Sequence, residues 1–412
     1  MVPKAGLEPA RYCYRWILSP LRLPIPSLRH ASATALELYN RHMMLSRNRI
    51  LQNISYTAHE SHFMHAFPGI PVRVSSSSVE KTVRIIYTDV NDLSEGTFMG
   101  KELWKTKSFN FTSWNAAKTD IEEAKKQIDS MVSGCSVNTV AITFAARQDH
   151  CYSTEIHWKG SHMFDEPKLA ELITHAKNAG LRVIVKPMLN VSDGYWRAYI
   201  RFFDEDVPCE PKWHDWFREY TDYIVHYARL CDRYGADMLI IGCELVGTDH
   251  RHREWRRLIE SVRSVYSGLL SYNCDKYQEH RVTWWDALDA ISSSGYYPIN
   301  DWDRQLARIY DTVTIYNKPF FFAETGCPST AGASMVPNDW NIIGRKETDL
   351  AEQNDFFRTM FEKSSVLDWH YGYCIWDWPM NLPAGYCPGK DGGYYVMGKP
   401  AQETIRHYFS KW

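Results

Sequence analysis

From about residue 81 onwards, short apolar runs alternate with longer stretches whose apolar residues recur at helical spacing. The runs TVAITF (139–144) and LRVIVKP (181–187) are almost continuously apolar, which is typical of strands buried on both faces of a parallel sheet. Trp213–Tyr234 instead repeats its large apolar residues with a helical period and is followed by Gly235, a common helix end. The pattern therefore predicts strands that alternate with amphipathic helices.

Eight strands are expected in this part of the chain. They cover 108–114, 139–144, 181–187, 237–243, 269–273, 290–297, 319–323 and 370–376. The helices expected among them cover 120–131, 166–178, 213–234, 254–266, 303–316, 350–363 and 401–410. Eight buried strands with covering helices predict an α/β protein with a closed (β/α)8 TIM barrel, which typically needs about 250 residues. We expect the barrel domain to span 81–412.

Residues 1–80 are expected to form an irregular N-terminal extension, either disordered or translated from a start codon assigned too early. Five prolines lie among several arginines in the first 43 residues, without periodicity, as in a translated non-coding leader. Met43, Met44 and Met64 are candidate true starts.

Two short segments near residue 80 have patterns of their own. Ser75–Ser78 consists of four serines and is expected to be a linker. Val83–Tyr87 is apolar and is expected to be a short strand outside the barrel.

Composition narrows the function. Hydrophobic residues make up 44% of 412 residues, enough for a large core, and the net charge of −2 gives no basic surface for nucleic acid or an anionic membrane. No apolar run is long enough to predict a membrane span. The chain is rich in aromatic residues, with 16 Trp and 25 Tyr. This excess fits either sugar-stacking surfaces or an aromatic core, and composition does not choose between them.

The ten cysteines contain no CxxC pair, and Cys243, Cys274 and Cys374 fall within apolar runs. Buried, reduced thiols are expected, which favours a reducing compartment. Because the N-terminus carries no clear secretory signal, a cytoplasmic location is expected. Secretion stays open, since a wrongly assigned start would also misplace a signal.

Two glutamates directly follow predicted strands. Glu244 follows IIGC of the fourth strand, and Glu324 follows PFFFA of the seventh. Either one alone could be a solvated loop residue or half of a salt bridge. Active sites of (β/α)8 barrels lie at the carboxyl ends of the strands, however, and retaining glycoside hydrolysis needs two carboxyl groups about 5–5.5 Å apart. The pair therefore predicts a glycosidase site.

At these positions the chain resembles a large clan of retaining glycosidases built on (β/α)8 barrels, and within it the glycoside hydrolase family 113 β-1,4-mannanases. The segments that carry the resemblance are VIVKPMLNVSDGYWRAYI (183–200), LIIGCEL (239–245), SSGYYPI (293–299), KPFFFAETGCPS (318–329) and Ile375–Trp378. The resemblance spans roughly residues 105–412 and rests on the order of all five segments. It implies cleavage of β-1,4-linked mannan or manno-oligosaccharides without a metal or other cofactor.

The resemblance also implies roles for individual residues. Glu244 would be the general acid/base and Glu324 the nucleophile. Glu324 must stay ionised and should accept hydrogen bonds, and Tyr296 or its neighbour Tyr297 matches the tyrosine beside the nucleophile. Glu244 must hold a proton, for which an apolar setting and the nearby charge of Glu324 are expected. Trp376 matches the tryptophan that forms the floor of the sugar site.

One position departs from the clan. Cys243 stands where many members have an asparagine that contacts the sugar 2-hydroxyl, and a thiol is a poor hydrogen-bonding group. The loop Asn190–Arg197 could supply substitute contacts, with Asn190 and Trp196 as candidates. Further candidates for sugar contacts lie near the ends of predicted strands. They are Trp114, Asn273, Trp284 and Trp285.

Three alternatives stay open. The same chemistry could act on xylan or another β-1,4-glycan. The barrel could bind carbohydrate without turnover, although such a module has no reason to keep two adjacent carboxylates. Asp249 and His250 could also belong to a metal-dependent hydrolase, but His250 and His252 are two apart and would not share a helix face.

Overall fold

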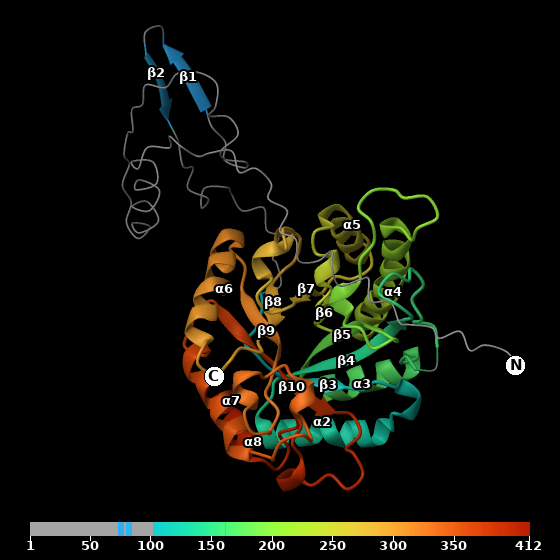
Figure 1. Ribbon diagram of the computed structural model, residues 1–412, viewed down its shortest axis with the longest axis vertical. Coiled ribbons are helices and arrows are strands. Elements are labelled where there is room, and N and C mark those ends of the chain that lie inside the picture. The colour runs from blue at the N-terminus through green and yellow to red at the C-terminus, as the bar shows by residue number, and fades with distance from the viewer. Residues whose placement is uncertain (1–72, 78–79, 85–101, 161) are drawn as a thin grey trace, which may run out of the picture. The chain divides into compact units, whose positions relative to one another are not determined.

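The computed structural model describes residues 73–77, 80–84, 102–160 and 162–412 (Figure 1). The chain divides into two compact units, Met1–Phe98 and Met99–Trp412. The division lies C-terminal to the domain boundary expected at residue 80. The predicted leader and its candidate start codons lie outside the described residues.

The first unit contains an antiparallel hairpin of β1 (Arg73–Ser77) and β2 (Glu80–Arg84), in which Val74 is the partner of Val83. The expected linker is wrong for its first three serines, which belong to β1. Serine has little intrinsic preference for a strand, but backbone pairing with β2 holds these residues extended. Of the strand expected at 83–87, residues 83 and 84 lie in β2 and the rest are outside the described residues.

The second unit is the predicted barrel, with eight parallel strands closed by pairing of the last strand with the first. In order around the barrel the strands are β3 (Thr106–Thr112), β4 (Thr139–Gln148), β5 (Arg182–Val191), β6 (Met238–Cys243), β7 (Leu269–Cys274), β8 (Ile291–Ser294), β9 (Phe320–Thr325) and β10 (His370–Pro379). The α/β fold class and the closed barrel are therefore confirmed.

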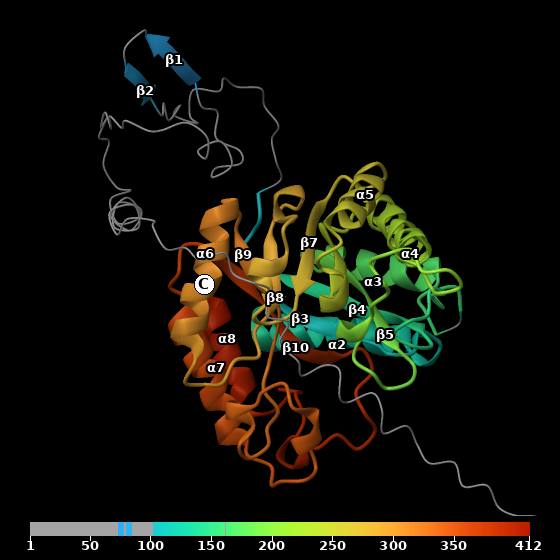
Figure 2. The ribbon, with the colours of Figure 1, turned by 45° about the horizontal axis from the view of Figure 1, so that its top comes forward.

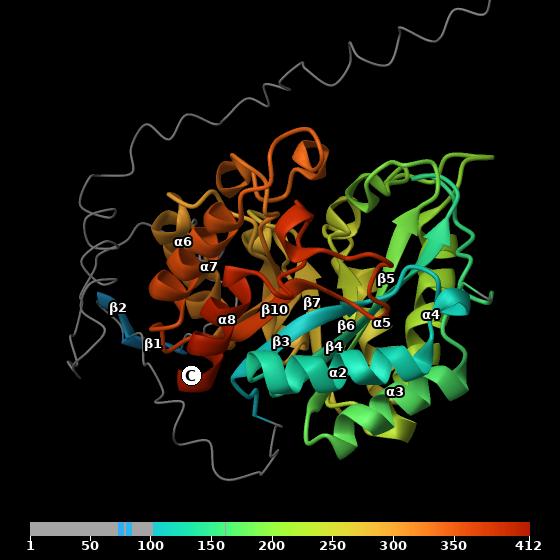
Figure 3. The same cartoon turned by 90° about the horizontal axis from the view of Figure 1, so that it is seen from below.

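The helices pack outside this barrel (Figures 1 and 3). They are α2 (Ile121–Cys135), α3 (Glu166–Asn178), α4 (Trp213–Tyr234), α5 (His252–Arg263), α6 (Trp302–Tyr316), α7 (Leu350–Ser364) and α8 (Pro400–Lys411). Helices α4 and α5 lie on one side of the barrel, and α6, α7 and α8 lie on the other (Figure 2). Between β7 and β8 the described chain forms only the 3-10 turns Glu279–Arg281 and Trp285–Ala287. No described helix has the length and apolarity that a membrane crossing requires.

Local signals explain the helix bounds that the sequence predicted best. Helix α3 begins after Asp165, whose side chain accepts a hydrogen bond from the backbone N–H of Lys168. Helix α4 ends at Gly235, which has φ 74° and donates its N–H to the Cys231 carbonyl. A side chain is strained in this left-handed conformation, so glycine fixes the end of α4.

The strand ends differ more from the prediction. Strands β4 and β5 pair in register as far as Gln148 and Val191, beyond their expected ends at 144 and 187. Strand β8 is shorter than expected, because regular pairing stops at Ser294 and the chain leaves the sheet. Residues 295–297 therefore form a loop at the carboxyl end of the barrel.

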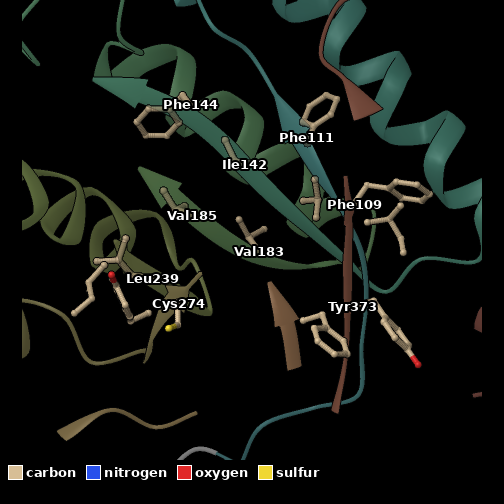
Figure 4. Close-up of a cluster of buried hydrophobic side chains, with 14 of the residues drawn as sticks. Phe109, Phe111, Ile142, Phe144, Val183, Val185, Leu239, Cys274 and Tyr373 are labelled. Atoms are coloured by element: carbon tan, nitrogen blue, oxygen red, sulfur yellow. The ribbon is translucent and has the colours of Figure 1, made fainter. Parts of the chain in front are cut away.

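Two apolar layers stabilise the barrel. Side chains turned outward from the strands pack under the helices, among them Phe109, Phe111, Ile142, Val183 and Val185 (Figure 4). A smaller layer fills the interior, with Ile184, Met238, Ile240, Phe321 and Cys374 among its members. Alternate strand residues thus face the helices and the barrel interior. Trp284 and Trp285, candidates for sugar contacts, are fully buried in the outer layer beside Trp255, so part of the aromatic excess is core.

Candidate active site

Glu244 and Glu324 lie at the carboxyl ends of parallel strands β6 and β9, and therefore at the same end of the barrel. Glu324 is still within its strand, whereas Glu244 is the first residue after its strand. Glu244 has φ 53°, which is uncommon for a residue with a side chain, and its N–H donates to the Asn273 carbonyl at 2.8 Å. Such backbone conformations concentrate at functional sites.

Glu324 is almost fully enclosed, with 4% of its surface exposed, and three side chains donate to it. Lys186 Nζ lies 2.5 Å from Oε1, the Cys243 thiol 3.2 Å from Oε1, and the Tyr296 hydroxyl 3.1 Å from Oε2. This is the hydrogen-bonded setting that the sequence predicted for a carboxylate that stays ionised.

Charge decides the protonation of this group. Burial alone would raise the pKa of Glu324, but the positive charges of Lys186 and Arg197 outweigh it and lower the pKa below its usual value. Burial likewise acts to lower the pKa of Lys186, but its acidic neighbours Cys243 and Glu324 raise it more, so the Lys186 pKa is raised. Both partners of this buried pair are therefore charged at neutral pH.

Sequence reasoning missed Lys186, the counter-ion of Glu324. It is fully buried on β5 and also donates to Asn273 Oδ1 at 2.7 Å and to Asn110 Oδ1 at 3.3 Å. A lysine inside the apolar run LRVIVKP was the available signal, because buried lysines occur almost only when paired. The Asn273 side chain, which was predicted to contact sugar, also donates to Ser294 Oγ. Asn273 is instead one of the buried polar side chains around Lys186.

Cys243 is another buried neighbour of Glu324. Burial raises the pKa of its thiol well above the usual range, so the group is a neutral donor to Glu324. Arg197 Nη1 lies 3.8 Å from the Cys243 sulfur. The position that departs from the clan therefore holds a weak hydrogen-bond donor directed at one of the two carboxylates.

Glu244 has a different environment. Its Oε2 accepts from Arg197 Nη1 at 2.8 Å and from the Trp196 indole at 3.2 Å, and its Oε1 accepts from Ser294 Oγ at 2.7 Å. The apolar setting expected for Glu244 is wrong, because the loop after β5 brings two donors to this carboxyl. The sequence showed the loop but not that it folds back over the end of β6.

Arg197 is itself held in place by the loop. Its Nε donates to the Leu189 carbonyl at 3.0 Å, and its Nη2 donates to Asn190 Oδ1 at 2.8 Å. Asn190 was expected to contact sugar, but its side-chain oxygen is occupied by this guanidinium. Asn190 therefore helps to orient Arg197, and its contact with sugar stays a prediction.

Tyr296 and Tyr297 point in different directions and have different hydrogen-bond partners. Tyr296 donates to Glu324, whereas Tyr297 is fully buried, donates to Glu279 at 3.1 Å and packs against Trp302 and Phe322. The expectation that Tyr297 contacts substrate is wrong, because consecutive residues of this extended segment point in opposite directions. Tyr296 is the tyrosine beside Glu324.

Two tryptophans lie on the Glu324 side of the site. Trp376 is 5% exposed and packs in one cluster with Cys243, Tyr296, Met188 and Tyr394. The Trp376–Asp377 peptide bond is cis. Trp114 contacts Trp376 with ring centroids 5.8 Å apart and is 40% exposed. An exposed indole beside a buried one gives this side of the site an aromatic surface. The sugar contacts of both residues stay predictions.

The residues considered for a metal have other partners. His250 Nε2 lies 2.8 Å from Asp204 Oδ1, and Asp249 Oδ1 accepts from the Tyr272 hydroxyl at 2.6 Å. Within residues 102–160 and 162–412, no three His, Cys, Asp or Glu side chains are grouped so that they could hold a metal ion.

A closed parallel barrel with two carboxyls at the ends of its fourth and seventh strands defines a class, the (β/α)8-barrel glycoside hydrolases. The sequence profile of Glycoside Hydrolase Family 113 matches residues 108–399. The chain belongs to this family.

Solved structures of this family are similar along the whole barrel. Two structures described as GH113 β-1,4-mannanase, one of them a complex, are 45% and 44% identical, with TM-scores of 0.72 and 0.71. Each match covers 76% of this chain and 100% of the other. The GH113 β-mannanase of Alicyclobacillus acidocaldarius, in complex with ManMIm, is 33% identical, with a TM-score of 0.70, over 75% of this chain and 97% of that one. No curated protein matches the chain. The protein is thus a glycoside hydrolase whose substrate is an oligo- or polysaccharide.

Proposed function

We propose that this protein is a retaining β-glycosidase that cleaves β-1,4-linked mannan or manno-oligosaccharides. The substrate is supported by similarity to the two GH113 β-1,4-mannanases that are 44% and 45% identical to this chain. We assign Glu324 as the nucleophile and Glu244 as the acid/base.

The reaction needs two displacements. In the first, a Glu324 oxygen attacks the anomeric carbon while the bond to the leaving oxygen breaks and Glu244 gives its proton to that oxygen. In the second, Glu244 takes a proton from water as the water oxygen displaces Glu324 from the anomeric carbon. Two inversions restore the β configuration, and both carboxyls return to their starting states.

The environment of Glu324 carries this assignment most strongly. A nucleophile must be ionised, and the charges of Lys186, buried 2.5 Å away, and of Arg197 outweigh burial and lower the Glu324 pKa. Removing a charged pair from water costs several kcal/mol per ion, so an enclosed Lys–Glu pair at a barrel mouth is an expensive arrangement. A barrel that only bound sugar would gain nothing from it, which weighs against the non-catalytic alternative.

Xylan and other β-1,4-glycans stay as a second candidate because they require the same two carboxyls. The test is product release from matched manno-, xylo- and gluco-oligosaccharides, with Glu324→Gln as the inactive control. Cleavage of the manno series with retention of configuration supports the proposal. Cleavage of another series alone would change the substrate but keep the mechanism. Tight binding without any cleavage would favour the binding barrel.

A further inference from the structure

We propose that the loop after β5 binds the sugars on the leaving-group side of the scissile bond, with Trp196 under the first sugar and Tyr199 under the second. This inference rests on the proposed function, since it takes Glu244 as the group that protonates the leaving oxygen. It extends that function to a part of the substrate that lies beyond the two carboxyls.

The first observation is a run of exposed aromatic side chains. Trp196 is 39% exposed and Tyr199 is 62% exposed, and Tyr195 and Phe203 in the same loop are also exposed. Most large aromatic side chains of this barrel are buried, so several exposed ones in one short loop are unusual. Exposed aromatic groups gathered at a site indicate a binding surface. The apolar faces of sugar rings fit such a surface, and their hydroxyls stay in water.

The second observation gives the position of this surface relative to the Glu244 carboxyl. The Trp196 indole donates to Glu244 Oε2 at 3.2 Å, so its ring lies directly beside the carboxyl. The leaving oxygen must lie within hydrogen-bond reach of that carboxyl when the proton is transferred. The sugar that carries this oxygen is therefore next to the exposed part of Trp196.

Trp196 and Tyr199 are in edge-to-face contact. Their ring centroids are 6.0 Å apart with an interplanar angle of 89°, and Lys276 Nζ lies 5.9 Å from the centre of the Trp196 ring. A lysine over an indole can also donate to sugar hydroxyls, which adds a polar contact at the same place. Tyr199 extends this surface beyond Trp196 and is the natural contact for a second sugar.

The loop packs against the 3-10 turn Val246–Thr248 that follows β6 and Glu244. A Cβ added to Gly247, just after Glu244, would lie 2.2 Å from the Ile200 carbonyl oxygen, so the two backbones are in direct contact. On the other side of Trp196, the Tyr195 N–H donates to Asp193 Oδ1 at 3.0 Å. Sugar-binding surfaces that are already ordered lose less entropy on binding. The loop therefore meets the requirement for a preformed site.

The other aromatic pair is connected to the opposite carboxyl. Trp376 shares a cluster with Tyr296, the donor to Glu324, and Trp114 contacts Trp376. We therefore assign this pair to the sugar that becomes attached to Glu324. The two aromatic surfaces divide the substrate at the bond that is broken.

The test compares two substrates that share the sugar bonded to Glu324. In mannotetraose the leaving group is a sugar chain, whereas in β-mannobiosyl fluoride it is a fluoride ion without a ring. Tyr199→Ala is expected to lower the ratio of kcat/KM for mannotetraose to kcat/KM for the fluoride roughly tenfold. Trp196→Ala should lower this ratio further, and Trp196→Phe, which keeps a ring, should lower it less. Tyr310→Ala removes an exposed tyrosine of α6 outside the site and should leave both rates unchanged.

The possible results distinguish a failure of this inference from a failure of the proposed function. If Tyr199→Ala and Trp196→Ala leave the ratio at its wild-type value while the wild type cleaves mannotetraose, the inference fails and the proposed function stands. An equal loss on both substrates would also overturn the inference, since it would mean that the loop acts only through the catalytic groups. If the wild type cleaves neither mannotetraose nor the fluoride, the proposed function itself fails.

Discussion

The two carboxyls of this site are held by different kinds of structure. Glu324 is contacted by Lys186 of β5, Cys243 of β6 and Tyr296, just beyond β8, so its environment is built by the barrel. Glu244 has one contact from a barrel strand, Ser294, and two from the loop after β5. The barrel fixes one carboxyl, and a loop completes the environment of the other.

This difference matches the two tasks. A nucleophile keeps its charge throughout the resting state, and a buried counter-ion on a rigid strand keeps that charge fixed where water is excluded. An acid/base must gain and lose a proton in each cycle. The loop donors Trp196 and Arg197 orient the Glu244 carboxyl beside the surface to which we assign the leaving group.

The largest effect is expected from removing the nucleophile. Glu324→Gln keeps the shape of the side chain but cannot form the glycosyl ester, so turnover of both mannotetraose and β-mannobiosyl fluoride should be lost. The measurement is initial rate against substrate concentration, with circular dichroism to show that the variant is folded. Substantial remaining activity on either substrate would show that another group attacks the anomeric carbon.

Removing the acid/base should have an effect that depends on the leaving group. Glu244→Ala is expected to slow mannotetraose cleavage by about 10²–10⁴-fold, because the leaving alkoxide then departs without a proton. Fluoride needs less help, so formation of the glycosyl-enzyme from β-mannobiosyl fluoride should be slowed far less. Pre-steady-state rates on both substrates measure this difference. An equal loss on both would contradict the assignment of Glu244.

Lys186→Met tests, through the pH dependence of activity, whether the barrel residue Lys186 keeps Glu324 ionised. In the wild type, Glu324 has a lowered pKa, so activity should fall only when the pH drops below the usual carboxyl range. Without Lys186, burial is opposed less, the Glu324 pKa rises, and the acidic limb of kcat/KM should move to higher pH. The Lys186–Glu324 pair also stabilises the fold at pH values above the pKa that Glu324 has in the unfolded chain. This stabilisation is lost as the pH falls through the lowered pKa of Glu324 in the folded protein.

Breaking this buried pair should also lower the free energy of unfolding by about 3–5 kcal/mol, measured by urea denaturation at neutral pH. Lys399→Met is the matched control, since Lys399 is a buried lysine paired with Asp391 at 2.7 Å away from the two glutamates. It should cost stability without moving the acidic limb. If both variants leave the limb unchanged, Lys186 does not set the ionisation of Glu324.

The smallest effect concerns two adjacent tyrosines. Tyr296→Phe removes one hydrogen bond to the Glu324 carboxylate and should lower kcat/KM roughly 10- to 100-fold, since bonds to charged groups are worth about 1.5–3 kcal/mol. Tyr297→Phe removes the bond to buried Glu279 and should lower the melting temperature while activity stays near that of the wild type. The reverse pattern would mean that Tyr297 is the tyrosine that acts on the nucleophile.

Much of the fold could be predicted because the relevant signals are local. Near-continuous apolar runs indicate buried parallel strands, and Gly235 ends α4 by its own backbone preference. The extensions of β4 and β5 could not be predicted, because pairing as far as Gln148 and Val191 depends on the neighbouring strand. Ser75 likewise lies in a hairpin strand only because β2 pairs with it.

The site was predictable where a residue's position along a strand decides its direction. Glu244 and Glu324 follow from strand ends, and the choice between Tyr296 and Tyr297 required knowing where β8 stops. Lys186, Arg197 and Ser294 act through contacts between strands or loops that are far apart in sequence. Such contacts depend on how the barrel closes and how its loops fold. Residue spacing along the chain does not reveal either.

Trapping the glycosyl-enzyme is the most direct test of Glu324 as the nucleophile. The wild type would be incubated with an activated 2-deoxy-2-fluoro-β-mannoside, digested, and its peptides sequenced by mass spectrometry. One added fluoromannosyl group is expected, carried by Glu324 and absent from Glu324→Gln. An adduct on Glu244 or any other residue, or hydrolysis with inversion and no adduct, would contradict the assignment of Glu324 as the nucleophile.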